Sequence, residues 1–237
     1  MKIKVWFWIY LLGIVTACTS IQLEPPPPSP TPIRVVITPL IFPLIQDSHH
    51  DCAAQNPGIA VSLEILPQSS LPADQTADIT ILMGEDFITK GIFAYQLGWE
   101  DIFLVSNPGV SIDLANLEKV RWEFLDSQRN LSIWTYPEGH ILRTIVEEII
   151  LENGHFSPNA MIASNPGEMV DTILQDPEAI GYIPGSWLKE GIHIIPLDPT
   201  IQARMRQPIL ALTHQEPDTL LSAYLSCLQS SWDQRTK

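Results

Sequence analysis

Three short polar stretches directly follow apolar, strand-like segments, and their residue types suit the binding of a small anion. In chain order the stretches are Thr38, Gly84-Glu85, and Tyr136-Pro137-Glu138-Gly139-His140. The carboxyl end of a strand and the start of the next helix offer free backbone N–H groups, and the helix dipole adds partial positive charge. Open α/β sheets hold their ligands at such ends. The pattern therefore favours the binding of a small anion at these three positions.

The third stretch leaves two interpretations open. Gly139 could offer its amide, and Arg143, one helical turn further on, could bind an oxyanion through two parallel hydrogen bonds. Glu138 would repel a fully ionised anion, so the ligand would need a proton to share. In the alternative, Glu138 is a first-turn acid that complements the helix dipole and Arg143 is a solvated surface charge.

Other polar and aromatic residues have a plain structural alternative. Asn107, before Pro108, could donate its side-chain amide to a ligand or simply form a turn. Tyr136, Tyr182 and Trp187 could line a cleft or belong to the core. His49 and Cys52 are three residues apart, but two ligands do not make a metal site.

The sequence contains no pattern typical of an enzyme active site. It has no Gly-x-Ser-x-Gly elbow, phosphate-binding loop, His-Glu-x-x-His or dinucleotide glycine fingerprint. Its acidic pairs, Glu147-Glu148 and Glu85-Asp86, are adjacent in sequence and would diverge on a helix or strand. We expect a binding protein without enzymatic activity, cofactor or metal.

Short apolar segments and amphipathic helices alternate along the chain. Most segments are continuous apolar runs, as expected of strands covered on both faces. The strands are predicted at Ile33–Ile37, Val61–Leu66, Ala77–Met83, Asp101–Ser106, Leu131–Thr135, Ala179–Ile183, His193–Pro196 and Pro208–Thr213, and helices at Gly139–Asn153, Asn165–Gln175 and Glu216–Gln229. The alternation predicts an α/β fold with mostly parallel sheets.

Composition excludes several classes of protein. The 237 residues carry 13 Lys and Arg against 27 Asp and Glu, a formal net charge of -14. Phosphate backbones are bound by clustered basic residues, so a nucleic-acid partner is not expected. A hydrophobic fraction of 45% is too high for a disordered acidic chain, and three cysteines are too few for a disulfide scaffold.

The N-terminal segment is typical of an export signal. Lys2 and Lys4 precede an apolar run from Val5 to Ala17 that is too short to span a bilayer as a helix. The ending Val15-Thr16-Ala17-Cys18 resembles the bacterial lipobox, which predicts a signal peptide at 1–17 and lipidation of Cys18. An ordinary signal peptide or an uncleaved anchor is the alternative.

Residues 18–32 would then form the lipidated cysteine and a spacer. The sequence LEPPPPSPTP favours extended polyproline II, which acts as a semi-rigid spacer. Such a spacer would hold an extracytoplasmic domain away from the bacterial membrane to which it is anchored. A recognition motif for an aromatic groove is the alternative. Outside the cytoplasm the two remaining cysteines, Cys52 and Cys227, could pair, but the sequence does not place them together.

Four stretches in order give a resemblance to a family. They are the first strand running into Thr38-Pro39; Asp101–Gly109 with the following Val110–Glu118; Asn165–Val170 with Asp176–Leu188, which includes Ala179-Ile180-Gly181-Tyr182; and Gln207–Thr213 with its helix. In order and spacing they resemble type II periplasmic solute-binding proteins, nearest the phosphate- and molybdate-binding group. The resemblance covers nearly all of the chain after the spacer.

The resemblance implies two α/β lobes joined by two crossing strands, with the ligand in the cleft. Lobe 1 would comprise 33–104 and 205–237, and lobe 2 would comprise 105–204. It also places the helix after Thr38 and the C-terminal helix on one lobe, which favours a Cys52–Cys227 bond. In phosphate-binding relatives a Ser-Gly-Thr tripeptide grips the anion, whereas this chain has Glu138-Gly139-His140 and lacks both hydroxyls.

Two functions remain open at this point. In the first, a monomeric lipid-anchored protein closes over a small solute, with an oxyanion such as phosphate as a candidate, and presents it to an ABC-type permease. In the second, a degenerate binding domain serves as a sensor or interaction module without a transport ligand, which the missing hydroxyls favour.

Overall fold

The structure is a computed structural model of the chain, and it describes residues 29–67, 76–85, 88, 91–110, 118, 120–121, 124 and 131–235. The predicted signal peptide, Cys18 and most of the spacer lie outside the described residues. So does most of the Val110–Glu118 stretch that contributes to the resemblance.

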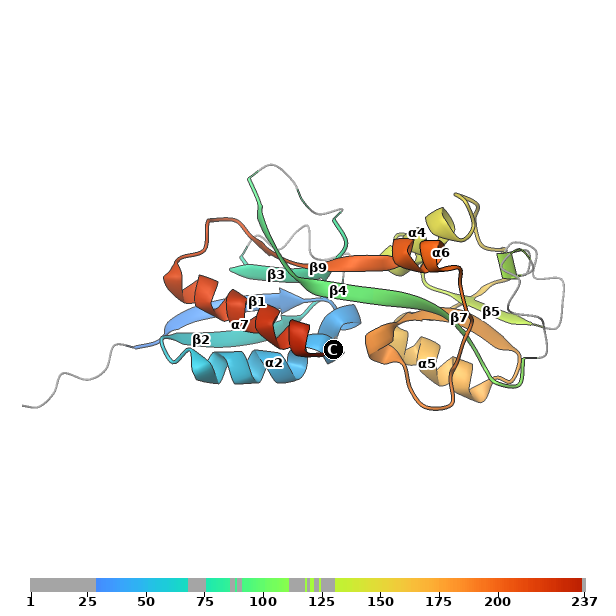
Figure 1. Cartoon of the computed structure of the whole chain (residues 1–237), viewed down its shortest axis with the longest axis horizontal. Coiled ribbons are helices and arrows are strands. Elements are labelled where there is room, and N and C mark those ends of the chain that lie inside the picture. Colours follow the sequence, from blue (N-terminus) through green and yellow to red (C-terminus); the bar gives the residue numbers. More distant parts are fainter. Residues whose placement is uncertain are drawn as a thin grey trace, which may run out of the picture.

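Two lobes lie end to end along the long axis of the molecule, and strand β4 (Phe93–Ser106) runs through both (Figure 1). The remaining elements of lobe 1 are β1 (Thr31–Ile37), η1 (Pro39–Ile41), α2 (Phe42–Gln55), β2 (Ile59–Ile65), β3 (Ile79–Met83), β9 (Arg206–Thr213) and α7 (Thr219–Arg235). Those of lobe 2 are β5 (Ser132–Thr135), α4 (Ile141–Ile149), β6 (Met161–Ile162), α5 (Pro166–Gln175), β7 (Ala179–Pro184), η3 (Gly185–Trp187), β8 (His193–Ile194) and α6 (Pro199–Arg204).

The crossing between lobes is visible in the strand register. β4 pairs with β9 as far as Asp101 and with β7 from Ile102 onward. β9 follows α6 of lobe 2 and returns the chain to lobe 1, so β4 and β9 are the two crossing strands. Division of the chain at 104/105 and 204/205 remains a proposal.

The sheet is mixed, whereas the sequence predicted mostly parallel sheets. Its strand order is β2-β1-β3-β9-β4-β7-β5-β6, with β8 also paired to β4. Among the described strands, the parallel pairs are β1 with β2 and β3, and β5 with β6 and β7. Every antiparallel pair contains β4 or β9. The prediction therefore holds within the lobes and fails at the two crossing strands, because a strand that returns to the first lobe reverses direction.

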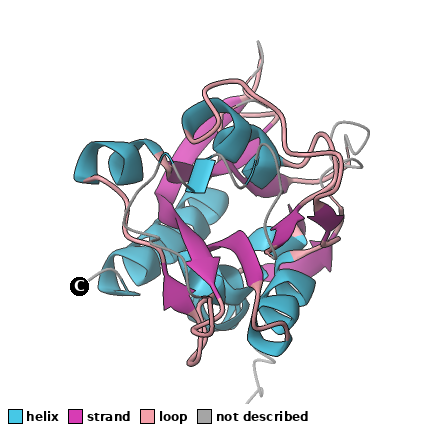
Figure 2. Ribbon diagram, turned by 90° about the vertical axis from the view of Figure 1, so that its right-hand side faces the viewer, coloured by secondary structure: helices cyan, strands magenta, loops and turns pink. Residues whose placement is uncertain are grey.

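Strands β1 and β3 of lobe 1 are buried on both faces. Val35, Ile37 and Ile81 face the main core, while Val36 and Leu82 face a smaller cluster on the other side. This alternation follows from the two-residue period of a strand. Helices α2 and α7 pack against one another on the main-core side (Figure 1), and a view along the long axis shows helices around the central strands (Figure 2).

A disulfide joins these two helices. Cys52 of α2 and Cys227 of α7 are bonded, with their Cα atoms 5.7 Å apart. This is the pairing that the resemblance implies. It connects segments separated by 175 positions and lies wholly within lobe 1.

A close approach fixes one glycine in β4. The strand register shifts between Gln96 and Gly98, and a Cβ atom at Gly98 would lie 2.2 Å from Cδ1 of Trp232. Trp232 is 3% exposed and donates its indole N–H to the carbonyl of Trp99, at 3.3 Å. Only glycine leaves room for this indole, which holds α7 against β4.

Candidate functional site

The start of α4 is capped by its own neighbour. His140 is the N-cap residue, and its Nδ1 accepts a hydrogen bond from the backbone N–H of Leu142, at 3.3 Å. The ring also stacks on Tyr136, with centroids 4.4 Å apart. Burial lowers the pKa of His140 to about 4, so the imidazole is neutral at pH 7. The backbone N–H of Leu142, one of those at the start of this helix, is thus already satisfied by a side chain.

Arg143 matches neither of the two interpretations drawn from the sequence. Its Nε donates to Glu147 at 2.9 Å, and its Nη1 donates to the carbonyl of Tyr136 at 3.2 Å. Its side chain is 12% exposed and lies over the ring of Phe156, 5.8 Å from the centroid. The arginine is therefore neither a solvated charge nor a free ligand for an anion, but ties α4 to the end of β5.

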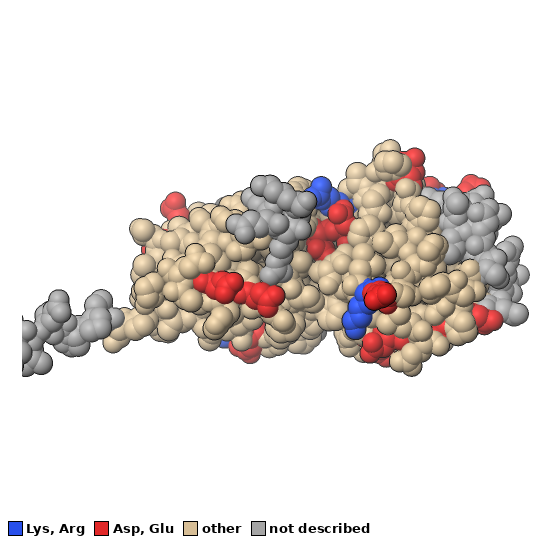
Figure 3. Space-filling model, turned by 60° about the horizontal axis from the view of Figure 1, so that its bottom comes forward, with Lys and Arg blue, Asp and Glu red and all other residues tan. Residues whose placement is uncertain are grey.

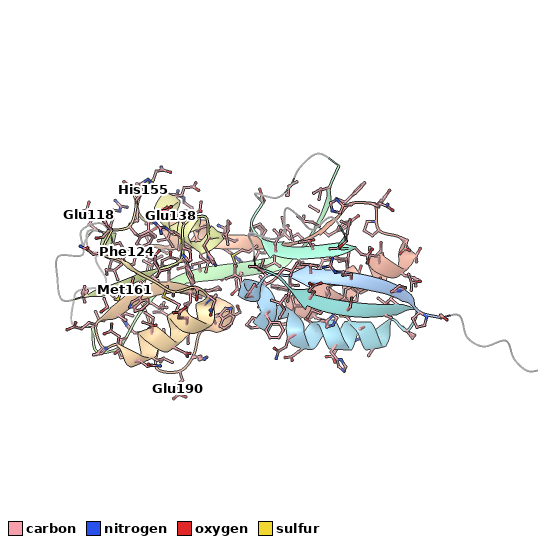
Figure 4. The ribbon with its side chains drawn as sticks, turned by 180° about the vertical axis from the view of Figure 1, so that it is seen from behind. Glu118, Phe124, Glu138, His155, Met161 and Glu190 are labelled. Atoms are coloured by element: carbon pink, nitrogen blue, oxygen red, sulfur yellow. A yellow bond between two sulfur atoms is a disulfide. The ribbon has the colours of Figure 1, made fainter. Side chains whose placement is uncertain are left out.

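Four other predicted site residues have structural roles or lie exposed on the surface. The amide of Asn107 donates to the carbonyl of Ile173 at 2.8 Å, and its oxygen accepts from Gly109, which is the role of a turn. Tyr136 is fully buried and donates to the carbonyl of Tyr182. Glu138 is exposed and lies on the surface of lobe 2, on the same side as His155 (Figure 4). Gly139 is exposed too, with a φ of 77° that suits glycine.

Thr38 is placed at a buried position with unused hydrogen-bonding capacity. It ends β1, is 4% exposed, and its Oγ1 has no hydrogen-bond partner among the described residues. The hydroxyl of Ser186, in η3 of lobe 2, is also buried without such a partner. A buried hydroxyl without a partner costs free energy, so such groups are rare in folded proteins and a bound ligand is one explanation for them.

Trp187, which follows Ser186 in lobe 2, forms a hydrogen bond to lobe 1. The indole N–H of Trp187 donates to the carbonyl of Leu40 in η1, at 2.8 Å. On the other side of η3, the backbone N–H of Ser186 donates to the carboxylate of Glu100 in β4, at 2.7 Å. Burial raises the pKa of Glu100, and the bond from Ser186 partly offsets that rise. Segment 185–187 therefore links the crossing strand to both lobes.

We expect Trp187→Phe to weaken the contact between the lobes. Phenylalanine keeps an aromatic ring but loses the N–H donor, at a cost of about 1 kcal/mol in unfolding free energy. Solution scattering should show a larger radius of gyration, because fewer molecules are closed. Trp99→Phe is the matched control, since Trp99 is 42% exposed and lies beside Arg206. Equal radii for Trp187→Phe and the unaltered chain would mean that the bond does not hold the lobes together.

A cavity of about 330 Å³ lies between the end of β3 and α4, where the two lobes meet. It is lined by Gly84, Glu85, Ile141, Thr144, Ile145, Glu148, Ile149, Arg204 and Gln207. A Cβ atom at Gly84 would lie 3.4 Å from Cδ1 of Ile141, so the lobes are already close there. Of the predicted site residues, only Gly84 and Glu85 line this cavity. We call it the interlobe cavity.

Sequence reasoning missed most of the residues that line this cavity. Thr144 and Glu148 are four positions apart on the exposed side of α4. The sequence shows this spacing, but it does not show which residues of the other lobe lie opposite. Arg204 and Gln207 belong to the second crossing, which brings them near α4. Ser186 could have been found, because it follows the carboxyl end of β7 just as Thr38 follows β1.

A second cavity, of about 360 Å³, lies at the opposite end of lobe 1. It is lined by the first residues of β1 and α7, among others, and contains none of the predicted site residues. Within the described part of the chain, no group of three or more His, Cys, Asp and Glu side chains could hold a metal ion. No described helix is long and apolar enough to cross a membrane.

No model of a known protein family matches the sequence, and no curated protein does. Solved structures do match the fold. A putative phosphate ABC transporter substrate-binding protein from Clostridium perfringens, solved with bound phosphate, matches with a TM-score of 0.67 at 12% identity, covering 84% of this chain and 93% of that one. An ABC-type phosphate transport receptor from Vibrio cholerae matches with a TM-score of 0.64 at 13% identity, covering 86% and 96%.

Regulatory proteins match equally well. A reduced form of OxyR from N. meningitidis has a TM-score of 0.67 at 17% identity, covering 84% of this chain and 95% of that one. At these identities the likeness concerns the fold alone. Together with two lobes, two crossing strands and a cavity between the lobes, it shows that this chain has the two-lobed type II periplasmic-binding-protein fold.

Proposed function

We propose that the protein is a lipid-anchored, extracytoplasmic solute-binding protein that captures a small solute between its lobes for an ABC-type permease. The observation that carries this proposal is the interlobe cavity, because it takes its walls from both lobes and from the second crossing segment. A solute that touches both lobes favours the closed arrangement over the open one, which is how such a fold works. Phosphate is not favoured, because His140 and Arg143 make contacts within the protein.

Thermal unfolding of the full-length chain against oxyanions, amino acids and sugars tests the proposal. A solute that binds only the folded chain adds about 2.7 kcal/mol at roughly 100 times its dissociation constant. For a chain of this size that raises the midpoint by about 5 to 10 °C. Solution scattering with the same solute should show a smaller radius of gyration. A rise in midpoint without any change in radius would contradict capture by closure.

A sensor or interaction module is the second candidate, and a specific observation favours it. The lobes are already joined by contacts of the protein's own residues, Trp187 with Leu40 and Ile141 near Gly84. A protein that needs no solute to bring its lobes together could present a fixed surface to a partner. The absence of any stabilising solute from a broad panel would support this candidate.

The anchor gives a separate prediction. In the full-length chain expressed in bacteria, Cys18→Ser should abolish incorporation of labelled palmitate and move the protein out of the detergent phase, because the acylated thiol is lost. An acidic chain is not attracted to anionic lipid, so the charge of the chain would not replace the acyl groups. Thr19→Ser is the control. Unchanged membrane association of Cys18→Ser would favour an uncleaved apolar anchor.

A further inference from the structure

The interlobe cavity has one strongly apolar wall. Ile141, Ile145 and Ile149 follow one another every four residues along α4, so they form a strip on one side of the helix. Each has little exposed surface, between 6% and 8%, and what remains exposed faces the cavity they line. Such a strip suits a short alkyl group.

The same cavity carries charges of both signs. Glu85 comes from lobe 1, Glu148 from α4 of lobe 2, and Arg204 from the end of α6. Among the described residues, none of these three side chains takes part in an ion pair within 4 Å. Figure 3 shows acidic and basic atoms near one another at the junction of the lobes. All three charged residues line the cavity and are exposed.

Two polar residues of the cavity lining, Gln207 and Thr144, form hydrogen bonds within the protein. The side-chain amide of Gln207 donates to the carbonyl of Arg204, at 3.2 Å, and so fixes the last turn of α6. Thr144 directs its hydroxyl to the carbonyl of His140, at 3.4 Å. One donor of Gln207 and the hydroxyl donor of Thr144 are thus used within the protein. The three charged groups and the apolar strip are the features of the cavity that distinguish ligand classes.

This combination selects among ligand classes. A phosphate would meet two carboxylates and one arginine, so repulsion would exceed attraction. A simple amine would leave the arginine without a partner, and a simple carboxylate would face two like charges. A zwitterion satisfies both signs, since a guanidinium binds a carboxylate bidentately and carboxylates accept from an ammonium group. The volume, near the lower end of about 300 to 1,000 Å³ for ligand pockets, limits the ligand to a small molecule.

We propose that the interlobe cavity binds an aliphatic α-amino acid. Arg204 holds its carboxylate, Glu85 and Glu148 hold its ammonium group, and the isoleucine strip packs against its side chain. This inference rests on the proposed solute-binding function and names the class of solute. Because the two carboxylates belong to different lobes, the ammonium group would draw the lobes together.

Titration calorimetry and thermal unfolding of the full-length chain with L-leucine test the inference. The comparison compounds are 4-methylpentanoate, which lacks the ammonium group, 3-methylbutylamine, which lacks the carboxylate, and inorganic phosphate. L-leucine should bind at least about tenfold more tightly than either single-charge analogue, because each lost charge removes a charge-assisted hydrogen bond.

Variants separate the roles of the charged residues. Arg204→Gln should weaken binding of L-leucine by about tenfold or more and leave that of 3-methylbutylamine unchanged or stronger. Glu148→Gln should weaken binding of both L-leucine and 3-methylbutylamine, because each carries an ammonium group. Lys189→Gln and Glu190→Gln are the matched controls, because both residues are exposed and Glu190 points away from the body of lobe 2 (Figure 4).

The outcomes distinguish failure of the amino-acid inference from failure of the proposed solute-binding function. If L-leucine binds and Arg204→Gln weakens it, the inference holds. If phosphate or a sugar raises the midpoint while L-leucine does not, the inference fails and the solute-binding function stands. If no solute in the panel raises the midpoint, both fail. Binding of L-leucine that is unaffected by Arg204→Gln and Glu148→Gln would place it outside this cavity and overturn the inference.

Discussion

Loss of the Cys52–Cys227 bond should lower the free energy of unfolding by about 4 kcal/mol, because a loop of this length costs considerable entropy to close in the unfolded chain. The bonded positions are separated by 175 residues. For a protein of this size the expected fall in the thermal midpoint is about 8 to 16 °C. Calorimetry of the Cys52→Ala, Cys227→Ala double variant measures it.

Reduction of the unaltered chain provides the control for the side-chain change. Cys52 is fully buried, so alanine also removes packing atoms, whereas reduction leaves both sulfurs in place. Both should lower the midpoint by a similar amount if the cross-link itself stabilises lobe 1. A midpoint that falls by less than about 2 °C in either case would mean that contacts between α2 and α7 already hold the helices.

Acid should destabilise the protein through His140. Its pKa is lowered from 6.5 to about 4 in the folded chain by burial. Between these two pH values the unfolded chain takes up a proton that the folded chain does not, so stability falls as the pH falls. The contribution is fully present above about pH 6.5, and roughly 3 kcal/mol is lost by about pH 4. Protonation would also remove the acceptor that caps Leu142.

His140→Asn isolates this effect, because asparagine can still cap a helix but does not titrate in this range. Urea unfolding at pH 7 and pH 4.5 should show that the unaltered chain loses about 2 to 3 kcal/mol more than the variant. Glu100, whose pKa is raised, acts in the opposite direction, but it is present in both proteins and cancels. His214→Asn, at an exposed position, should retain the full acid loss. Parallel behaviour of His140→Asn and the unaltered chain would show that His140 titrates normally.

The sequence predicted helices and strands well where local signals alone determine them. Asn165, at the start of the predicted helix, caps α5 by accepting from the backbone N–H of Glu168. Glu168 accepts from the backbone N–H of Ser164, one residue before the N-cap position that a capping box would use. The strand at 179–183 and the helix opened by His140 also lie where expected. The first part of β4 was missed, because Gln96, Gly98 and Glu100 interrupt its apolar run and its burial comes from β9 and α7.

The side chains of the candidate site were harder to predict than its position. The rule that ligands sit at strand ends led to Thr38, Gly84 and Glu85, which the structure places at the lobe boundary or beside it. It could not tell that Arg143 would turn toward Glu147, although their four-residue spacing permits that pair. The rule also could not predict that Arg204 lines the cavity, because the position of Arg204 depends on how β9 returns to lobe 1.

The position of β9 also constrains the order in which the lobes can fold. β9 lies between β3 and β4 in the sheet, yet it follows every strand of lobe 2 in the chain. During synthesis or export, one edge of β3 therefore stays unpaired until about 120 further residues have emerged and β9 is available. Pairings between strands so far apart in the chain form slowly. Lobe 2 can assemble during that interval. An exposed edge in a nascent chain invites pairing with a neighbour, so the waiting half of lobe 1 is where a chaperone would be of most use.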